Sequence, residues 1–173
     1  IACCLVGSEM CIRDRLLVAA VNDPNPVMYL EHKKLYRKPD IKMEVPLGLY
    51  EVEIGKGKIV KKGSDLTIVT WSGMVSVATE AAKQLENDGI NVEIVDIRTI
   101  VPLDEEIILT SVEKTSNLCI LQEDVPFSSV ASEISSLVAE KGFWNLDNPI
   151  VKVTPPNTHL SLIHISEPTR QHA

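Results

Sequence analysis

Strand-like and helix-like segments alternate along residues 66–153, and this alternation restricts the possible folds more than any other feature of the sequence. Short apolar runs are separated by longer segments in which apolar residues recur every three or four positions, as on one face of a helix. The apolar runs cover residues 66–70, 92–97, 118–121 and 151–153. Because strands joined by single helices form right-handed crossover units, the pattern predicts an α/β fold with a doubly wound, mostly parallel sheet.

The helices predicted between these runs carry recognisable start and stop signals. Apolar residues recur on one face of the first helix, and Gly89 follows as a C-terminal stop. The second helix is expected to begin at Asp104, where acidic residues follow at its positive end, and the third to end at Gly142. The run at 118–121 is continuously apolar, which indicates a strand covered on both faces.

Two shorter features precede the regular part of the chain. Residues 27–30 form a β-rich run after a proline-containing turn, which indicates a short strand. Glycines bracket the lysine-rich residues 56–62 and indicate a hairpin or an approach to an edge there. They do not form a phosphate-binding loop, because a dinucleotide fingerprint needs a third glycine and a phosphate loop needs a Gly-Lys-Ser/Thr ending.

The two ends of the chain differ from its body. Residues 1–15 hold three of the four cysteines, and no Cys or His pair recurs at a spacing that would complete a closed zinc site. Neither residues 1–15 nor residues 161–173 carry a sustained helix or strand period, and both resemble translated sequencing-adapter read-through. We therefore expect both segments to be non-native. The remaining chain divides into a connection with a short strand at 16–50 and a domain at 51–160.

Charge and length exclude several classes of function. The chain of 173 residues carries a formal net charge of −7, so its surface should repel nucleic-acid phosphates and anionic lipid headgroups. No apolar run approaches the roughly 20 residues of a spanning helix, and the first residues lack the basic region of a secretion signal. We expect an intracellular protein with no nucleic-acid or membrane partner, which works on small molecules or other proteins.

Ligands of doubly wound sheets bind beyond the carboxyl ends of the strands, so the residues there are the first site candidates. They are Ser72, Arg98, Thr99, Glu123 and Asp124. Arg98 could clamp a carboxylate or phosphate, while the acidic pair could share a proton or bind that arginine. A structural ion pair between Arg98 and Glu123 or Asp124 at a subunit interface explains the same residues, and we favour it over substrate contact.

The remaining reactive residues do not assemble into a complete active site. Cys119 lies inside an apolar run, where its thiolate would be disfavoured, so we expect core packing rather than nucleophilic catalysis. His32 beside Glu31 could act as an acid or base near neutral pH, but a surface or interface histidine explains it more simply. His159 is the other histidine in the body and shares no metal-ligand spacing with His32.

Longer motifs in residues 16–160 resemble the beta subunit of 2-oxo acid dehydrogenase decarboxylating components. The clearest are Leu-Glu-His-Lys at 30–33, Leu-Tyr-Arg at 35–37, Asp-Ile-Arg-Thr-Ile-Val-Pro-Leu-Asp at 96–104, Gln-Glu-Asp at 122–124 and Ala-Ser-Glu-Ile at 131–134. The resemblance covers the transketolase-type C-terminal domain and part of the connection before it. The Leu-Tyr-Arg and Gln-Glu-Asp forms look more like the branched-chain, or 2-oxoisovalerate, type than the pyruvate type.

The resemblance implies that this chain is part of a thiamine-dependent oxidoreductase. The intact enzyme would decarboxylate a branched-chain 2-oxo acid or pyruvate on thiamine diphosphate and transfer the acyl group to a lipoyl group. In that family the cofactor and its magnesium ion lie between the alpha subunit and the other half of the beta subunit, which also holds the catalytic histidine and glutamate. We therefore expect this part alone to be inactive and to bind no cofactor or metal. Arg98 matches a substrate-side arginine of related thiamine enzymes and is a candidate for such a contact.

In this family the C-terminal domain helps to build a heterotetramer of alpha and beta subunits and docks the peripheral-subunit-binding domain of the acyltransferase core. Asp147, in the Leu-Asp-Asn-Pro motif at 146–149, matches the docking aspartate, although a turn-capping role explains it equally well. An exposed carboxylate beside a proline can steer a basic partner. Our candidates for subunit-interface contacts are His32, Glu123 and Asp124.

Two alternatives stay open: a free-standing subunit-association or docking module, and the C-terminal domain of another transketolase-family enzyme. The chain departs from the family at 128–129, where Ser-Ser replaces Gly-Gly, and at 157–159, where Asn-Thr-His replaces Asp-Thr-Pro. The second departure suggests that the domain is incomplete after Leu160. The family implies a cytoplasmic location in a bacterium or the mitochondrial matrix in a eukaryote.

Overall fold

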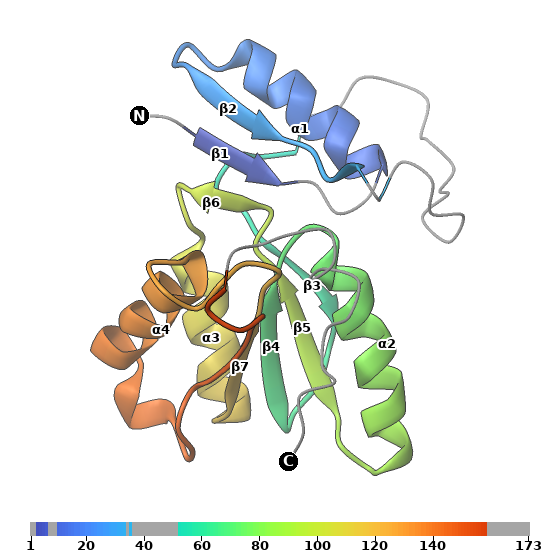
Figure 1. Cartoon of the computed structure of the whole chain (residues 1–173), viewed down its shortest axis with the longest axis vertical. Coiled ribbons are helices and arrows are strands. Elements are labelled where there is room, and N and C mark those ends of the chain that lie inside the picture. The colour runs from blue at the N-terminus through green and yellow to red at the C-terminus, as the bar shows by residue number, and fades with distance from the viewer. Residues whose placement is uncertain (1–2, 7–9, 34, 36–51, 159–173) are drawn as a thin grey trace.

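The computed structural model describes residues 3–6, 10–33, 35 and 52–158, which form two β-sheets with helices packed against them (Figure 1). The larger sheet contains β3 (Lys58–Lys61), β4 (Leu66–Thr70), β5 (Val92–Asp96), β7 (Leu118–Leu121) and β8 (Val151–Val153). The smaller sheet contains β1 (Cys3–Val6), β2 (Val27–Leu30) and β6 (Thr99–Val101). The tail at 161–173, His159 and the connection at 36–50 lie outside the described residues.

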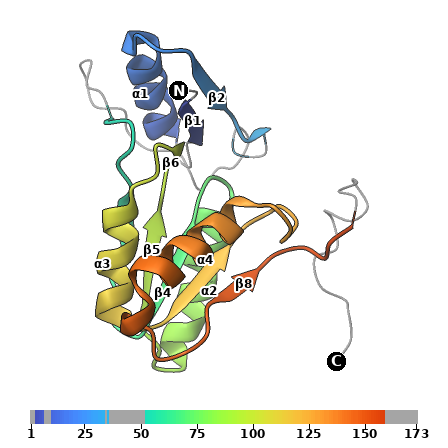
Figure 2. The same cartoon turned by 90° about the vertical axis from the view of Figure 1, so that its left-hand side faces the viewer.

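The larger sheet has the strand order β3-β5-β4-β7-β8. Strand β4 runs parallel to β5 and β7, and β7 runs parallel to β8, whereas the edge strand β3 is antiparallel to β5. Helix α2 (Met74–Asn87) covers one face, while α3 (Glu105–Thr115) and α4 (Val130–Lys141) cover the other (Figures 1 and 2). The prediction of a doubly wound, mostly parallel sheet is confirmed, and the glycine-bracketed segment is an edge strand.

The helices begin and end close to the positions that the sequence signals predict. Asp104 is the N-cap of α3, and its carboxylate accepts a hydrogen bond from the backbone N–H of Ile107. Gly89 follows α2 with φ of +81°, a left-handed turn that ends the helix without the steric cost of a Cβ. Gly142 is the C-cap of α4, and its N–H bonds the carbonyl of Val138.

Two apolar layers hold the larger sheet to its helices. The layer under α3 and α4 includes Val69, Val95, Ile108, Ile120 and Ile134, all of which are fully buried. The thinner layer under α2 includes Ile68, Ala78, Ala82, Val92 and Ile94. Full burial of each large aliphatic side chain contributes about 1.5–3 kcal/mol, so these layers supply most of the stability of the domain. Within the described part of the chain, every helix is too short or too polar to cross a membrane.

Strand β7 is covered less completely than its apolar sequence predicts. Leu118 and Ile120 are buried in the layer under α4, but Cys119 and Leu121 on the opposite face are only half-buried. Helix α2 packs over β4 and β5, and β7 lies beyond them next to the edge strand β8. Cys119 and Leu121 still pack against the layer under α2, so the second face of β7 is covered in part, because α2 lies mainly over the neighbouring strands.

The smaller sheet has the order β2-β1-β6, with β1 parallel to β2 and antiparallel to β6. Helix α1 (Met10–Asn22) connects β1 to β2 and buries Leu16 against Val27 and Ile54. The expectation that residues 1–15 carry no regular structure is wrong. A central strand is held by backbone hydrogen bonds on both sides, so it needs no alternating side-chain pattern. The non-native origin of these residues stays a prediction.

A buried polar cluster on β5 joins the sheet to α3. Glu93 is 1% exposed and accepts hydrogen bonds from Ser111 Oγ at 2.6 Å, Lys114 Nζ at 2.5 Å and the Gly63 N–H at 3.3 Å. Burial alone would raise the pKa of Glu93, but the hydrogen bonds and the charge of Lys114 hold it below its usual value. A Cβ on Gly63 would lie 2.2 Å from the carbonyl carbon of Val92, so only glycine allows this close approach.

Candidate functional site

The connections of the larger sheet change direction between β4 and β7. From β4 the chain passes through α2 to β5, whereas from β7 it passes through α4 to β8 on the other side. The segments beyond the carboxyl ends of β4 and β7 therefore diverge and leave a crevice, which is the usual ligand position in open α/β sheets. Ser72 follows β4 and Glu123 follows β7 at this point.

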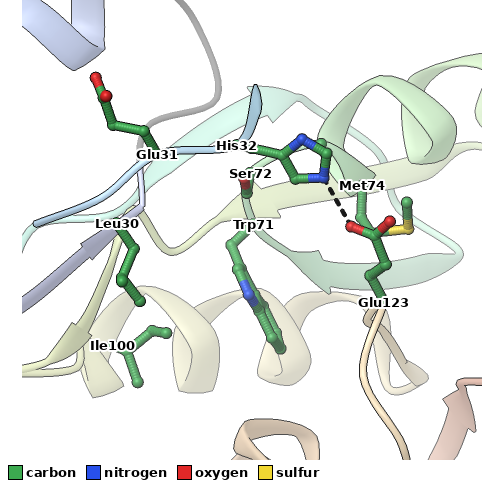
Figure 3. Close-up of a pocket in the computed structure, with 9 residues that line it drawn as sticks. Leu30, Glu31, His32, Trp71, Ser72, Met74, Ile100 and Glu123 are labelled. Atoms are coloured by element: carbon green, nitrogen blue, oxygen red, sulfur yellow. Dashed lines mark hydrogen bonds and ion pairs between the residues drawn. The ribbon is translucent and has the colours of Figure 1, made fainter. Parts of the chain in front are cut away.

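A pocket of about 220 Å³, which we call the switch-point pocket, occupies this crevice (Figure 3). Three segments line it: the end of β2 with the residues after it, the turn between β4 and α2 with the first residue of α2, and the residue after the end of β7, together with one residue of β6. The lining residues are Leu30, Glu31, His32, Trp71, Ser72, Gly73, Met74, Ile100 and Glu123. Four large apolar side chains are thus combined with the Glu123 carboxylate, an imidazole and a hydroxyl, whereas the carboxylate of Glu31 points away from them (Figure 3).

His32 and Glu123 meet across the pocket from different sheets (Figure 3). His32 Nε2 lies 2.7 Å from Glu123 Oε2, and the two side chains are 20% and 38% exposed. An ionised carboxylate only accepts hydrogen bonds, so Nε2 carries the shared hydrogen. The ring also packs over Gly73, where a Cβ would stand 3.0 Å from Nε2. The assignment of both side chains to a subunit interface stays a prediction.

Ser72 lies at the sharp turn between β4 and α2, with a left-handed φ of +54°. The residue is 7% exposed, and its Oγ has no hydrogen-bond partner among the described residues. The same is true of Nδ1 of His32. A buried polar atom without a partner costs about 1–3 kcal/mol, so these two atoms are the groups of the pocket that a ligand could satisfy.

Arg98 lies outside the pocket lining, beside Asp96 at the end of β5. Its Nε is 3.9 Å from Asp96 Oδ2, and its backbone N–H donates to Asp96 Oδ1 at 3.2 Å. Asp96 is the carboxylate whose distance to Arg98 the structure gives, and the expected ion pair of Arg98 with Glu123 or Asp124 at a subunit interface stays a prediction. The left-handed φ of +55° at Arg98 turns the chain back on Asp96, and no sequence signal reveals that turn. Substrate contact by Arg98 stays a prediction.

Three further candidates have local contacts that explain them. Thr99 Oγ1 accepts a hydrogen bond from the Gly55 N–H at 3.2 Å, which fixes the segment before β3. Asp124 is exposed, and its carboxylate accepts from the N–H of the next residue. Burial raises the pKa of the Cys119 thiol, which disfavours the reactive thiolate and agrees with a packing role.

Asp147 lies between the 3-10 helix η3 (Phe143–Asn145) and β8. Its backbone N–H donates to the carbonyl of Ser116 at 2.9 Å, which ties this turn to the end of α3. Its side chain is exposed and makes no hydrogen bond or ion pair with the described residues. The carboxylate of Asp147 therefore caps no turn among the described residues, and it faces solvent.

Sequence reasoning missed the apolar walls of the pocket. Trp71 and Met74 flank the turn after β4, so the strand-end rule could have been extended to them. Leu30 and Ile100 belong to β2 and β6, and nothing in the sequence signals that these strands share a separate sheet above the crevice. For the same reason, the contact between His32 and the end of β7 could not be predicted.

The family model of the transketolase C-terminal domain matches residues 55–168. The chain belongs to this family. The larger sheet, its three helices and most of the switch-point pocket lie within the transketolase C-terminal domain. Leu30, Glu31 and His32 come from the segment before it.

Several curated proteins are similar to this chain. It is 47% identical over 139 residues to the pyruvate dehydrogenase E1 component subunit beta of Acholeplasma laidlawii, which covers 80% of this chain and 42% of that protein. It is 40% identical over 142 residues to the 2-oxoisovalerate dehydrogenase subunit beta of Bacillus subtilis, covering 82% of this chain and 43% of that protein. The chain spans less than half the length of these relatives. Pyruvate and 2-oxoisovalerate types both match well, so these comparisons do not favour the branched-chain type.

Two further proteins are similar to this chain. The acetoin:2,6-dichlorophenolindophenol oxidoreductase subunit beta of Bacillus subtilis is 44% identical over 143 residues, covering 83% of this chain and 41% of that protein. Among solved structures, a split-gene transketolase described as an inactive beta4 tetramer matches with a TM-score of 0.68 and 24% identity, covering 90% of this chain and 47% of that one. This structural match supports the fold.

Within the ranges that the structure describes, no group of three or more His, Cys, Asp or Glu side chains could hold a metal ion. Magnesium bound to a diphosphate prefers an octahedral set of oxygen ligands. We assign none of these side chains to the cofactor.

Proposed function

We propose that this chain is the C-terminal part of the beta subunit of a thiamine-dependent 2-oxo acid dehydrogenase. The 47% identity over 139 residues with the pyruvate dehydrogenase E1 component subunit beta of Acholeplasma laidlawii carries the proposal. The whole enzyme would oxidatively decarboxylate a 2-oxo acid and pass the acyl group to a lipoyl group. It would work in the bacterial cytoplasm or, in a eukaryote, in the mitochondrial matrix.

In the proposed enzyme this part serves assembly rather than chemistry. Thiamine diphosphate and magnesium would be held by the alpha subunit and the other half of the beta subunit, so this part alone would be inactive. The partners of this part would be an alpha subunit, a second beta subunit and the peripheral-subunit-binding domain of the acyltransferase core. Support for the last contact comes from Asp147, whose exposed carboxylate makes no hydrogen bond or ion pair with the described residues.

The substrate we propose is a branched-chain 2-oxo acid. The Leu-Tyr-Arg motif at 35–37 and the Gln-Glu-Asp motif at 122–124 support this choice, with pyruvate as the alternative. The 44% identity with an acetoin oxidoreductase subunit favours a second candidate, the C-terminal domain of another transketolase-family enzyme.

Hybrid subunits test the proposal and the second candidate together. Residues 16–158 would replace the corresponding segment in the 2-oxoisovalerate, pyruvate and acetoin subunits named above, and each hybrid would be produced with its own alpha subunit. We expect the two dehydrogenase hybrids to bind their alpha subunits and decarboxylate their own substrates, with the 2-oxoisovalerate hybrid keeping the larger share of activity. Assembly of the acetoin hybrid alone would overturn the proposal, and better retention in the pyruvate hybrid would overturn the branched-chain choice.

Docking by Asp147 is tested separately in the active hybrid. Charge steering predicts that Asp147→Asn weakens binding of the acyltransferase segment about ten-fold, chiefly at low salt, while decarboxylation with an artificial electron acceptor is unchanged. Asp88→Asn, which removes an exposed carboxylate after α2, is the matched control. Equal binding by the Asp147 variant and the parent would remove the docking assignment.

A further inference from the structure

The edge strand β3 and the residues beside it carry a cluster of lysines that the proposed function does not use. Four of the seven residues at 56–62 are lysines, although the formal net charge of the chain is −7. Lys61 is half-buried, and its Nζ lies 2.5 Å from Glu86 Oε1 of α2. The other three are exposed and make no hydrogen bond or ion pair with the described residues: Lys56, Lys58 and Lys62. Their charges are therefore open to a partner.

Hydrogen bonds to the rest of the domain fix the backbone that carries these lysines. The N–H of Gly57, before the strand, donates to Asp104 Oδ2 at 2.9 Å. The N–H of Gly63, after the strand, donates to Glu93 Oε2 at 3.3 Å. Between these points β3 pairs with β5. Binding to a fixed backbone costs less conformational entropy than binding to a mobile segment, so this surface is organised before a partner arrives.

The spacing of the three exposed lysines fits a short acidic segment of polypeptide. A strand rises about 3.3 Å per residue, so up to about 20 Å separates the Cα atoms of Lys56 and Lys62. That span is longer than a single phosphate or carboxylate group, but several acidic side chains of one segment can cover it. Ile59 lies within the span and is 37% exposed, which adds apolar contact. We call Lys56, Lys58, Ile59 and Lys62 the basic edge.

We propose that the basic edge binds an acidic polypeptide segment through its lysine side chains. The register of β3 and β5 shifts between Ile59 and Lys61, and a bulge together with edge lysines disfavours the addition of another strand. The segment therefore binds through its carboxylates and not by strand pairing. A polypeptide is favoured over nucleic acid or a lipid surface, because the net charge of −7 repels long polyanions. The inference is independent of the proposed function, because direct binding by this chain needs no other subunit.

Fluorescence anisotropy of a labelled peptide, Glu-Ser-Glu-Ile-Glu-Ser-Glu, titrated with the full chain, tests the proposal. We expect saturable binding that weakens as salt is raised from about 0.05 M to about 0.5 M, because salt screens exposed charges. The same peptide with glutamine in place of every glutamate should bind at least about ten-fold more weakly. Equal binding of the two peptides, or tighter binding of an oligothymidylate of equal charge, would overturn the proposal.

Two triple variants with the same change in net charge locate the binding. The first combines Lys56→Gln, Lys58→Gln and Lys62→Gln. The second replaces three lysines that are exposed elsewhere, by Lys33→Gln, Lys83→Gln and Lys152→Gln. We expect the first variant to bind the acidic peptide about ten-fold more weakly than the second, because three exposed ion pairs are lost. Equal affinity of the two variants would overturn the proposal. Greater self-association of the first variant with unchanged peptide affinity would also overturn it, since the lysines would then only protect the edge.

Discussion

Left-handed backbone at non-glycine residues marks the places where this fold departs from local preference. Among the described residues, Ser72, Arg98, Ser116 and Ser128 have φ between +49° and +55°. Ser72 and Arg98 follow strands at the carboxyl edge of the larger sheet, and Ser128 stands where the family resemblance leads us to expect glycine. Glycine at these positions would have indicated left-handed turns in the sequence, whereas serine and arginine give no such signal.

Ser116→Gly is expected to stabilise the chain. Ser116 ends α3 with φ of +55°, and its N–H bonds the carbonyl of Val112, as in a helix cap that glycine usually provides. Glycine avoids the left-handed penalty, so we expect the free energy of unfolding to rise by about 0.5–1 kcal/mol. Denaturant titration measures the change. Ser116→Ala keeps the strain and should show no gain, and a loss of stability in Ser116→Gly would contradict this account.

Glu93 should make stability depend on acid. Its pKa is lowered from 4.5 in the folded chain, so its contribution is present above about pH 4.5 and is lost as pH falls through the folded pKa. Glu93→Gln should cost about 1–3 kcal/mol near neutral pH, with the deficit shrinking below about pH 4.5. Urea unfolding at several pH values measures this. Glu113→Gln on the exposed face of α3 is the control, and a deficit that does not change with pH would contradict the prediction.

At the scale of single residues, the candidate site could be predicted in part from the sequence. The rule that ligands bind beyond the carboxyl ends of parallel strands identified Ser72 and Glu123, because both follow strands whose apolar sequence is clear. It did not find the partner of Glu123. His32 follows a strand of the other sheet, and its approach depends on tertiary packing that local sequence does not encode.

At the scale of elements, the side-chain pattern predicted those helices and strands whose formation depends on the burial of apolar residues. Strands β4 and β7 and the ends of α3 and α4 agree with the sequence signals, because apolar period and caps reflect the same contacts that hold them. Strand β1 and the start of α1 were missed. Their place depends on backbone pairing with β2 and β6, which leaves no period in the side chains.

Asp104→Ala tests the cap of α3. Asp104 accepts from the Ile107 N–H through Oδ1 and from the Gly57 N–H at 2.9 Å through Oδ2, so it fixes both α3 and the start of β3. Loss of an N-cap costs about 1–2 kcal/mol, and we expect at least this loss in the free energy of unfolding, measured with denaturant. Asp104→Asn keeps one acceptor and should be intermediate. Equal stability of the alanine and asparagine variants would contradict the assigned contacts.

At the scale of the molecule, large apolar side chains remain on the surface. Trp144 is 93% exposed and packs edge-on against Phe143, which is 57% exposed, and Phe127 is 76% exposed. Large exposed apolar side chains favour association, so we expect the chain to self-associate as its concentration rises. Light scattering after size-exclusion chromatography measures this. Trp144→Gln should reduce the association, and a monodisperse monomer of the parent chain at high concentration would contradict the expectation.

The position of β1 also has a consequence for the order of folding. This strand pairs with β2, a short distance along the chain, and with β6, roughly a hundred residues away. Pairings between distant segments form slowly, because the long intervening loop loses entropy when it closes. The five-stranded sheet contains mostly nearer pairings, so it can form first and present β6 as a template. The smaller sheet would then close last, and the switch-point pocket would be completed only in that final step.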